Sequence, residues 1–420
     1  MKTLVLTSLS ILLATGAYAE TTENTENGEN TSKFTLSDVI ENPFASSQGT
    51  STGSSTSDGP KFKFTPAGRI LVDGAAYAPN NDGFASGFAL PDIRIGGKAS
   101  YGNWSAKIDL GFGYGKLSLK DVYLQYSFSG TNNYLRAGYF VHQYGLNAAT
   151  SSSFKPSGEA PLSDNFFAAT GRNIGIMFVL DLPKYFMGVS GIMGGGYEST
   201  DNYGRNSFAA LGRFVWRPIT TDGVVQIGVS PWIASPLYNH EKGDHGHVEL
   251  TGKYFKFSTN FPTRVSKVAM MGATIDDARS LFKLTPELVL SYGRFALESQ
   301  YYWMNVSRQH DKKSYSANGV YGLLRTLILG DSSYGYSHGD AGLALPKPKT
   351  LEMVLGYNYT DGNRHGINGG IVNDYSVTFN YYINKYMIAR LAWHYSDVRN
   401  SAVMFDRHVN IIQARLQFKF

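Results

Sequence analysis

Charged side chains recur at every second position in many segments of this 420-residue chain. Lys107 and Asp109 share one face of such a segment, and Trp104, Ile108 and Leu110 occupy the other. Because successive side chains of a β-strand point to opposite sides, this spacing predicts one face in contact with water and one in contact with lipid. Charges of both signs on a water-filled wall create a transverse field that orders water and passes polar solutes. The chemistry indicated is solute passage.

The same alternation along the chain predicts a set of pore-lining charges. The candidate lining residues are Arg69, Arg94, Lys98, Lys107, Asp109, Arg136, Arg213, Arg294, Glu298, Arg390 and Arg415, joined on the same face by Asp73, Asp121, Arg217, Glu287, Glu352, Asp374 and Lys419. In an alternative interpretation, many of these charges pair across neighbouring strands and stabilise the wall without touching solute.

Segments of about ten residues with this period must position those charges. We count seventeen between residues 62 and 420, separated by Gly, Asn, Asp and Ser clusters. An odd number cannot close an antiparallel barrel with both ends on one side, and omitting 246–257 places the tightest turns together on the periplasmic side. The fold predicted is an all-β transmembrane antiparallel barrel of sixteen strands. Segments 143–171 and 235–282 then become long outer loops, and 329–349 a long periplasmic turn.

The composition agrees with a membrane barrel. Aromatic residues make up 14% of the chain and charged residues 17%, and there are 46 Gly, 28 Tyr and 25 Phe. After the N-terminal segment, no apolar run approaches the roughly 18 residues that a spanning helix needs. A chain of this kind crosses a membrane only as a closed barrel, since closure satisfies every backbone hydrogen bond in lipid. The absence of Cys excludes disulfides and thiolate metal sites, and we expect no cofactor.

The N-terminal sixty residues differ from the rest. Residues 1–19 combine Lys2, an apolar run and Ala17-Tyr18-Ala19, which predicts a cleaved signal peptide. Residues 20–60 are rich in Ser, Thr, Asn and Gly and hold seven acids against one base, which predicts an acidic low-complexity periplasmic tail. The chain carries +5 in all, residues 1–19 carry +1 and residues 20–60 carry −6, so the barrel segment 61–420 carries +10. A basic barrel favours anions or binds lipopolysaccharide phosphates.

Several motifs resemble the phosphate-selective porin family of the porin O and P type. They are LKDVYLQY (119–126), LRAGYFVHQYGL (135–146), GRNIGIMF (171–178), GVYGLLRTLILGD (319–331) and FNYYIN (379–384). The resemblance implies a homotrimeric sixteen-stranded porin of the bacterial outer membrane, with long segments folded into the lumen and basic residues along the solute route. The loop after the fifth strand would then form the constriction.

That loop, residues 144–170, carries one base, Lys155, and two acids, Glu159 and Asp164. It offers no cluster of lysines to an oxyanion, so the function predicted is passive diffusion of small hydrophilic solutes with a mild anion preference. A phosphate- or polyphosphate-selective porin is the alternative.

Two other classes of function compete with a porin. An outer-membrane barrel hydrolase would need a serine, a histidine and a carboxylate brought together across strands, and no Gly-x-Ser-x-Gly motif occurs. We therefore expect no enzyme. His245 and His247 would share a face if extended and are weak candidates for a metal site, but a solvated outer loop is the simpler interpretation. The partners expected are outer-membrane lipids, lipopolysaccharide and small solutes or anions, with no nucleic acid.

Overall fold

The computed structural model describes residues 60–78, 83–151, 153–168, 171–193, 207–242 and 248–420. The predicted signal peptide and all of the acidic tail except Pro60 lie outside these residues, and so do His245 and His247. None of the described helices is long and apolar enough to span a membrane.

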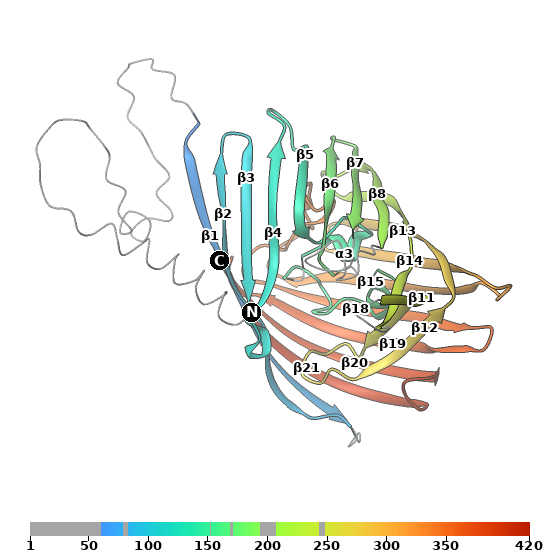
Figure 1. Ribbon diagram of the computed structural model, residues 1–420. Coiled ribbons are helices and arrows are strands. Elements are labelled where there is room, and N and C mark those ends of the chain that lie inside the picture. The colour runs from blue at the N-terminus through green and yellow to red at the C-terminus, as the bar shows by residue number, and fades with distance from the viewer. Residues whose placement is uncertain (1–59, 79–82, 152, 169–170, 194–206, 243–247) are drawn as a thin grey trace, which may run out of the picture. The chain divides into compact units, whose positions relative to one another are not determined.

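Sixteen strands close into one antiparallel barrel, each paired with its neighbours in chain order (Figure 1). They are β1 (Phe62–Ala78), β2 (Gly87–Tyr101), β3 (Trp104–Gly111), β4 (Ser118–Ser127), β5 (Tyr134–Phe140), β6 (Asn173–Asp181), β7 (Tyr185–Met193), β8 (Phe208–Ile219), β9 (Val224–Ala234), β13 (Ala278–Tyr292), β14 (Phe295–Arg308), β15 (Tyr315–Leu329), β18 (Thr350–Arg364), β19 (Ile367–Tyr382), β20 (Met387–Ser401) and β21 (Arg407–Lys419). The closing pair joins β1 to β21, with Arg69 opposite Lys419. The sixteen-strand prediction is confirmed.

The omitted segment 246–257 coincides with β11 (Val248–Asn260), which does form a strand but lies outside the wall. It pairs with β10 (Leu237–Lys242) and β12 (Ala269–Asp276) in a separate three-stranded sheet. The periodicity of residues 246–257 therefore reports a real strand. Its exclusion from the barrel, predicted because an odd number of strands cannot close, is confirmed.

Burial along the barrel strands is inverted relative to a soluble protein. On β21 the polar Gln413, Arg415 and Gln417 are buried, while Ile412 and Leu416 are exposed. The same inversion recurs around the barrel, where large exposed side chains are mostly apolar or aromatic. An outward apolar face and an inward polar face are what a lipid-embedded barrel requires.

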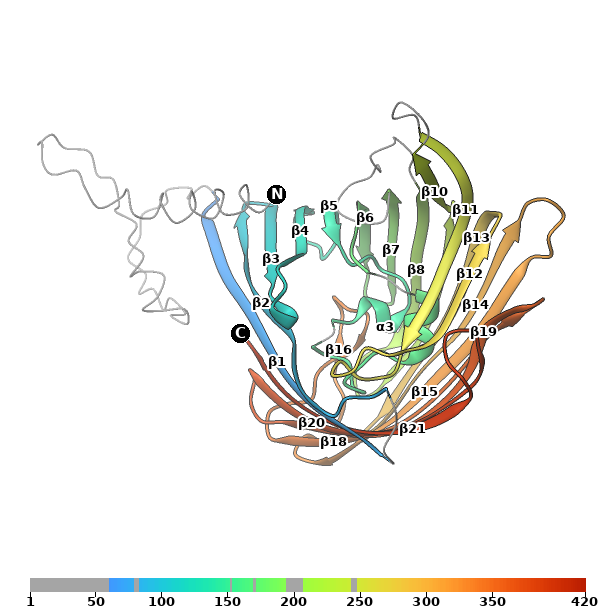
Figure 2. The same ribbon diagram turned by 60° about the horizontal axis from the view of Figure 1, so that its bottom comes forward.

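Besides the sheet β10–β12, whose Phe257 packs against Phe166 and against Tyr315 of β15, two connecting segments fold into the barrel and bury its polar inner face. Segment 141–172, between β5 and β6, contains the helical turn α3 (Leu146–Ala149) and the π-helical turn η3 (Asp164–Ala168). Segment 330–349, between β15 and β18, contains the short hairpin β16 (Tyr336–Ser337) and β17 (Gly342–Leu343). Figure 2 shows α3 and β16 inside the ring of strands. A 3-10 turn, η2 (Gly113–Gly115), follows β3.

The outward position of Leu355 on β18, which is 42% exposed, allows a test of the lipid-facing assignment. Replacing Leu355 with Arg should destabilise the folded barrel by about 2–4 kcal/mol, the cost of a lipid-facing Arg near the bilayer midplane. Phe405→Arg, at an exposed site between β20 and β21, should cost far less. Urea titration in lipid vesicles, read by the faster gel migration of unheated folded barrel, measures both. Equal costs would contradict the assignment.

Candidate functional site

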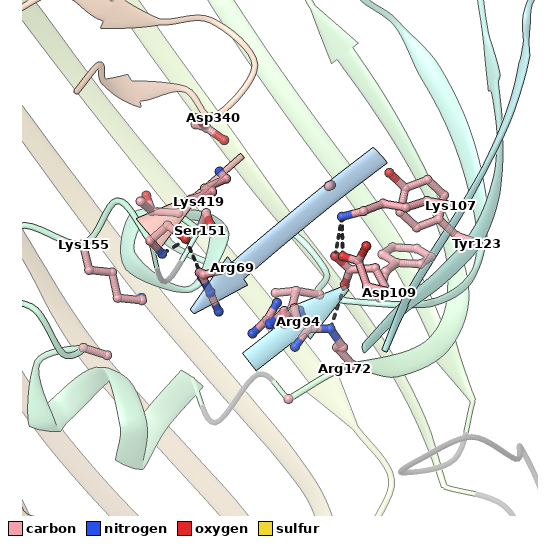
Figure 3. Close-up of a pocket in the computed structure, with 18 of the residues that line it drawn as sticks. Arg69, Arg94, Lys107, Asp109, Tyr123, Ser151, Lys155, Arg172, Asp340 and Lys419 are labelled. Carbon is pink, nitrogen blue, oxygen red and sulfur yellow. Dashed lines mark hydrogen bonds and ion pairs between the residues drawn. The ribbon is translucent and has the colours of Figure 1, made fainter. Parts of the chain in front are cut away.

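A cavity of about 640 Å³ runs between the wall formed by β1 to β5 and the in-folded segment 141–172. Figure 3 shows basic side chains from both sides pointing into it. Its charged lining residues are Arg69, Arg94, Lys107, Asp109, Asp121, Arg136, Lys155, Glu159, Asp164, Arg172, Arg264, Asp340 and Lys419. Eight of these are bases and five are acids, so the cavity has a positive surplus.

The strand register places like charges directly opposite one another on this wall. Arg69 of β1 faces Arg94 of β2 on one side and Lys419 of β21 on the other, and Lys98 of β2 faces Lys107 of β3. Like charges directly opposite are destabilising in a sheet. Two of these bases also form ion pairs across strands, Arg69 with Asp92 and Lys107 with Asp121, as the alternative interpretation predicts.

Acids within the wall offset part of that repulsion. Asp92 forms ion pairs with both Arg69 and Arg94, and the Arg94 pair is 2.8 Å long. Asp121 contacts Lys107 at 3.0 Å and Arg172 at 2.7 Å. Lys107 also pairs with Asp109 at 2.8 Å, so the two carboxylates Asp109 and Asp121 balance Lys107 and Arg172. Asp92, in contrast, is one carboxylate for Arg69 and Arg94, which leaves a net positive charge there.

The opposite side of the lumen is closed by packing. The in-folded segment buries Phe166 and Phe167 against Tyr302 of β14, whose hydroxyl donates a hydrogen bond of 2.8 Å to Asp164. Ser163 donates from its backbone to Asn358 of β18 at 2.9 Å. The cavity described above therefore lies on the side of β1 to β5.

Glu159 anchors the tip of the in-folded segment. It forms ion pairs with Arg415 of β21 and with Arg264, which lies between β11 and β12. Arg415 also pairs with Asp73 and donates to the backbone oxygen of Gly158 at 2.6 Å. Burial alone would raise the pKa of Glu159, but Arg264 and Arg415 outweigh it and lower this pKa to about 2. Glu159 thus stays charged at neutral pH.

The second in-folded segment is held by buried guanidinium groups. Arg213 of β8 forms an ion pair of 2.7 Å with Glu287 of β13 and donates to the backbone oxygens of Asp340 and Ala341. These contacts seat segment 330–349 in the lumen and bring the Asp340 carboxylate to the cavity. A long turn predicted at this place is thus a lumen-lining element.

The predicted site residues fall into three groups. Eight of them line the cavity together: Arg69, Arg94, Lys107, Asp109, Arg136, Lys155, Glu159 and Asp164. Lys98 lies on the same wall opposite Lys107, outside the lining set. Arg213, Glu298, Arg390 and Arg415 face the lumen but are buried. The three arginines hold backbone oxygens or carboxylates of the in-folded segments, and Glu298 pairs with Arg325 of the neighbouring strand.

Arg294 is the exception, and its assignment as a pore-lining residue is corrected by its position. It lies in the tight turn between β13 and β14, is exposed, and donates to the backbone oxygens of Leu327 and Ile328. Arg294 directly precedes Phe295, the first residue of β14, and there the turn breaks the two-residue period.

Sequence reasoning missed five charged groups near the cavity, namely Asp92, Lys120, Arg172, Arg264 and Asp340. Register shifts interrupt the alternation at Asp92 of β2 and at Lys120 of β4. The other three lie in connections, where strand periodicity carries no information. The length of the turn containing Asp340 was the available signal.

A serine, a histidine and an aspartate do meet in the lumen. His394 Nδ1 lies 3.1 Å from Asp374, and Ser396 donates its hydroxyl to the same carboxylate. Both side chains therefore bind the aspartate, whereas a catalytic triad requires the serine to donate to the histidine. The three residues are buried, and this arrangement is that of a structural network.

Comparison with known proteins places this geometry in a family. The model of the family described as phosphate-selective porin O and P matches residues 68–420. The solved anion-selective porin from Comamonas acidovorans is similar with a TM-score of 0.54 at 12% identity, over 86% of this chain and 100% of that one. In-vitro folded OmpT of Vibrio cholerae, in its trimer form, has a TM-score of 0.53 at 10% identity, with the same two coverages. No curated protein matches the chain in sequence.

The two solved structures share the sixteen-strand barrel architecture with this chain, and the family match covers all of the wall except the first residues of β1. The protein forms a porin channel. The chain belongs to the phosphate-selective porin O and P family of bacterial outer-membrane β-barrels.

Proposed function

We propose that this porin passes small hydrophilic anions in preference to cations, along the cavity between β1–β5 and the in-folded segment. The observation that carries the proposal is the row of like charges Lys419, Arg69 and Arg94 on three adjacent strands, beside the Lys98–Lys107 pair. Fixed positive charge raises the local concentration of anions within about a Debye length, roughly 8 Å at physiological salt.

The arrangement of the bases supports a mild preference. Most guanidinium groups at the cavity already share a carboxylate, as Arg69 and Arg94 share Asp92. Lys155, the one base of the in-folded loop 144–170, donates its ammonium protons to the side chain and backbone oxygens of Asn147. Tight phosphate binding needs several donors that are free to converge on one anion. The phosphate-selective alternative therefore has less support.

We also propose a homotrimer embedded in outer-membrane lipid and lipopolysaccharide. The strands β3 to β7 have 7–10 residues, whereas β13, β14, β15, β18, β19 and β20 have 14–16. The short strands make a low part of the barrel wall, which suits an interface covered by other copies of the chain. The long strands make a tall part, which suits contact with lipid. The trimer form of OmpT supports this assembly by likeness of fold.

Charge removal at the cavity tests the anion preference. Arg136 and Lys419 have no carboxylate within ion-pair distance in the described part of the chain. Replacing both with Gln should lower the chloride-to-potassium permeability ratio, measured from reversal potentials in a salt gradient. Each lost charge acts through water at short range, so the difference should shrink in high salt.

Arg294→Gln is the matched control for that pair, because Arg294 lies in a turn away from the cavity and should leave the ratio unchanged. A cation-selective wild-type pore at low salt would overturn the proposal. Saturable block by phosphate at micromolar concentration would instead favour the phosphate-selective alternative.

The Glu159 anchor predicts a pH dependence. Because its pKa is lowered to about 2 from an ordinary 4.5, the carboxylate stabilises the folded segment fully above about pH 4.5 and loses this effect only as pH falls toward 2. Wild-type current should therefore stay quiet from pH 8 to pH 5. Glu159→Gln should flicker already at pH 7, because Arg264 and Arg415 lose a shared partner.

Single-channel recordings between pH 8 and pH 3 measure this difference. Asp222→Asn, in the exposed turn between β8 and β9, provides an acid-to-amide control that should behave as wild type. Quiet wild-type-like current from Glu159→Gln at pH 7 would show that other contacts hold the segment.

A further inference from the structure

Arg136 has surroundings unlike those of the other bases at the cavity. Its guanidinium carbon lies 4.1 Å from the ring centre of Tyr123, 4.8 Å from that of Tyr134 and 5.3 Å from that of Phe140. Its Nε–H and one Nη2–H donate to Gln125 Oε1, at 3.1 and 2.7 Å. We call Arg136 with these three rings the Arg136 platform.

The guanidinium is left with unused hydrogen-bond donors. Of its five N–H groups, two bind the Gln125 oxygen, and the other three have no acceptor among the residues that the structure describes. Arg136 is half-buried and lines the cavity, so these donors are accessible to solute. A planar guanidinium with free parallel N–H groups matches a carboxylate in a bidentate pair.

The rings of the platform are held by packing. Phe140 is 1% exposed and packs in a cluster with Met177, Val179, Phe186 and Val215. Tyr123 and Tyr134 pack against the same cluster, and Tyr123 meets Phe140 edge to face with ring centres 5.9 Å apart. The platform is therefore preorganised, so the binding of a solute costs little side-chain entropy.

The cavity around the platform has more bases than acids in its lining, which favours an anion. Lys107 of β3 lies directly opposite Tyr123 of β4, and its ammonium is balanced by Asp109 and Asp121 at 2.8 and 3.0 Å, so Arg136 is the base of this region without an ion pair in the described part of the chain. Asp340, from the in-folded segment 330–349, is the acid on the other side, and its carboxylate accepts a hydrogen bond from Ser337. Its negative charge opposes long residence of an anion, as transport requires.

We propose that the Arg136 platform is a binding subsite for organic carboxylates that carry a flat ring, with the carboxylate on Arg136 and the ring against Tyr123. This inference rests on the proposed anion preference and names a solute class within it. An inorganic anion uses the charge of Arg136 but gains nothing from the rings, whereas an aromatic carboxylate uses both.

Block of ionic current in planar bilayers tests the subsite with three probes of equal charge: benzoate, cyclohexanecarboxylate and acetate. We expect benzoate to block at the lowest concentration, about fivefold below acetate, which is the magnitude of one aromatic contact. Cyclohexanecarboxylate has a similar size without a flat π-face, and it should fall between the two. Equal block by benzoate and cyclohexanecarboxylate would overturn the role of the rings, and equal block by all three would overturn the subsite.

Two variants locate the effect. Tyr123→Leu should remove most of the advantage of benzoate over acetate, whereas Tyr375→Leu, on the lipid-facing side of β19, should keep it. A benzoate advantage that survives in Tyr123→Leu would place the site elsewhere and overturn the proposal. The comparison of the three probes on the wild-type protein stands even where a variant fails to fold.

Reversal potentials in potassium chloride, recorded on the same channels, separate this inference from the proposed function. Chloride preference together with equal block by the three probes overturns the subsite alone. A wild-type channel without chloride preference overturns the proposed function as well.

Discussion

Arg415 forms ion pairs with two carboxylates, Asp73 on the adjacent strand and Glu159 on the in-folded segment. The position of the in-folded segment in the lumen depends on these two pairs. A barrel wall of sixteen strands encloses more space than its own side chains can fill. The size of the pore is therefore set by where the in-folded segment is fastened. Arg415 and Arg390 fasten it to β20 and β21, which leaves the cavity along β1 to β5 open.

The same residue type serves two purposes according to its surroundings. Guanidinium groups buried beneath the in-folded segments, such as Arg213, are matched by carboxylates and backbone oxygens, because an unmatched buried charge is costly. At the cavity, Arg94 and Lys419 are partly exposed, where water lowers that cost, and the buried Arg69 between them is matched by Asp92. Solvation thus separates the anchoring charges from those that set ion preference.

The sequence alone predicts the wall well and the lumen poorly, for a physical reason. Alternation is imposed on every strand by lipid on one side and water on the other, so the sixteen strands and the face of Arg94 or Arg136 follow from it. It cannot separate a base that lines the cavity from one covered by an in-folded segment, as Arg390 is, because both point inward. It also fails at turns and register shifts, where Arg294 and Lys120 lie.

If solutes pass beside β1 to β5 while the opposite side of the lumen is closed, the two sides differ in their accessibility to a reagent in the pore. The chain has no Cys, so single serine-to-cysteine variants report on each side separately. Ser151 lines the cavity, whereas Ser376 of β19 is buried beside the in-folded segment. An anionic methanethiosulfonate reagent added during single-channel recording should react with Ser151→Cys and reduce its conductance, and leave Ser376→Cys unchanged. Reduction of conductance in Ser376→Cys with none in Ser151→Cys would place the solute route beside β19 and contradict a route along β1 to β5.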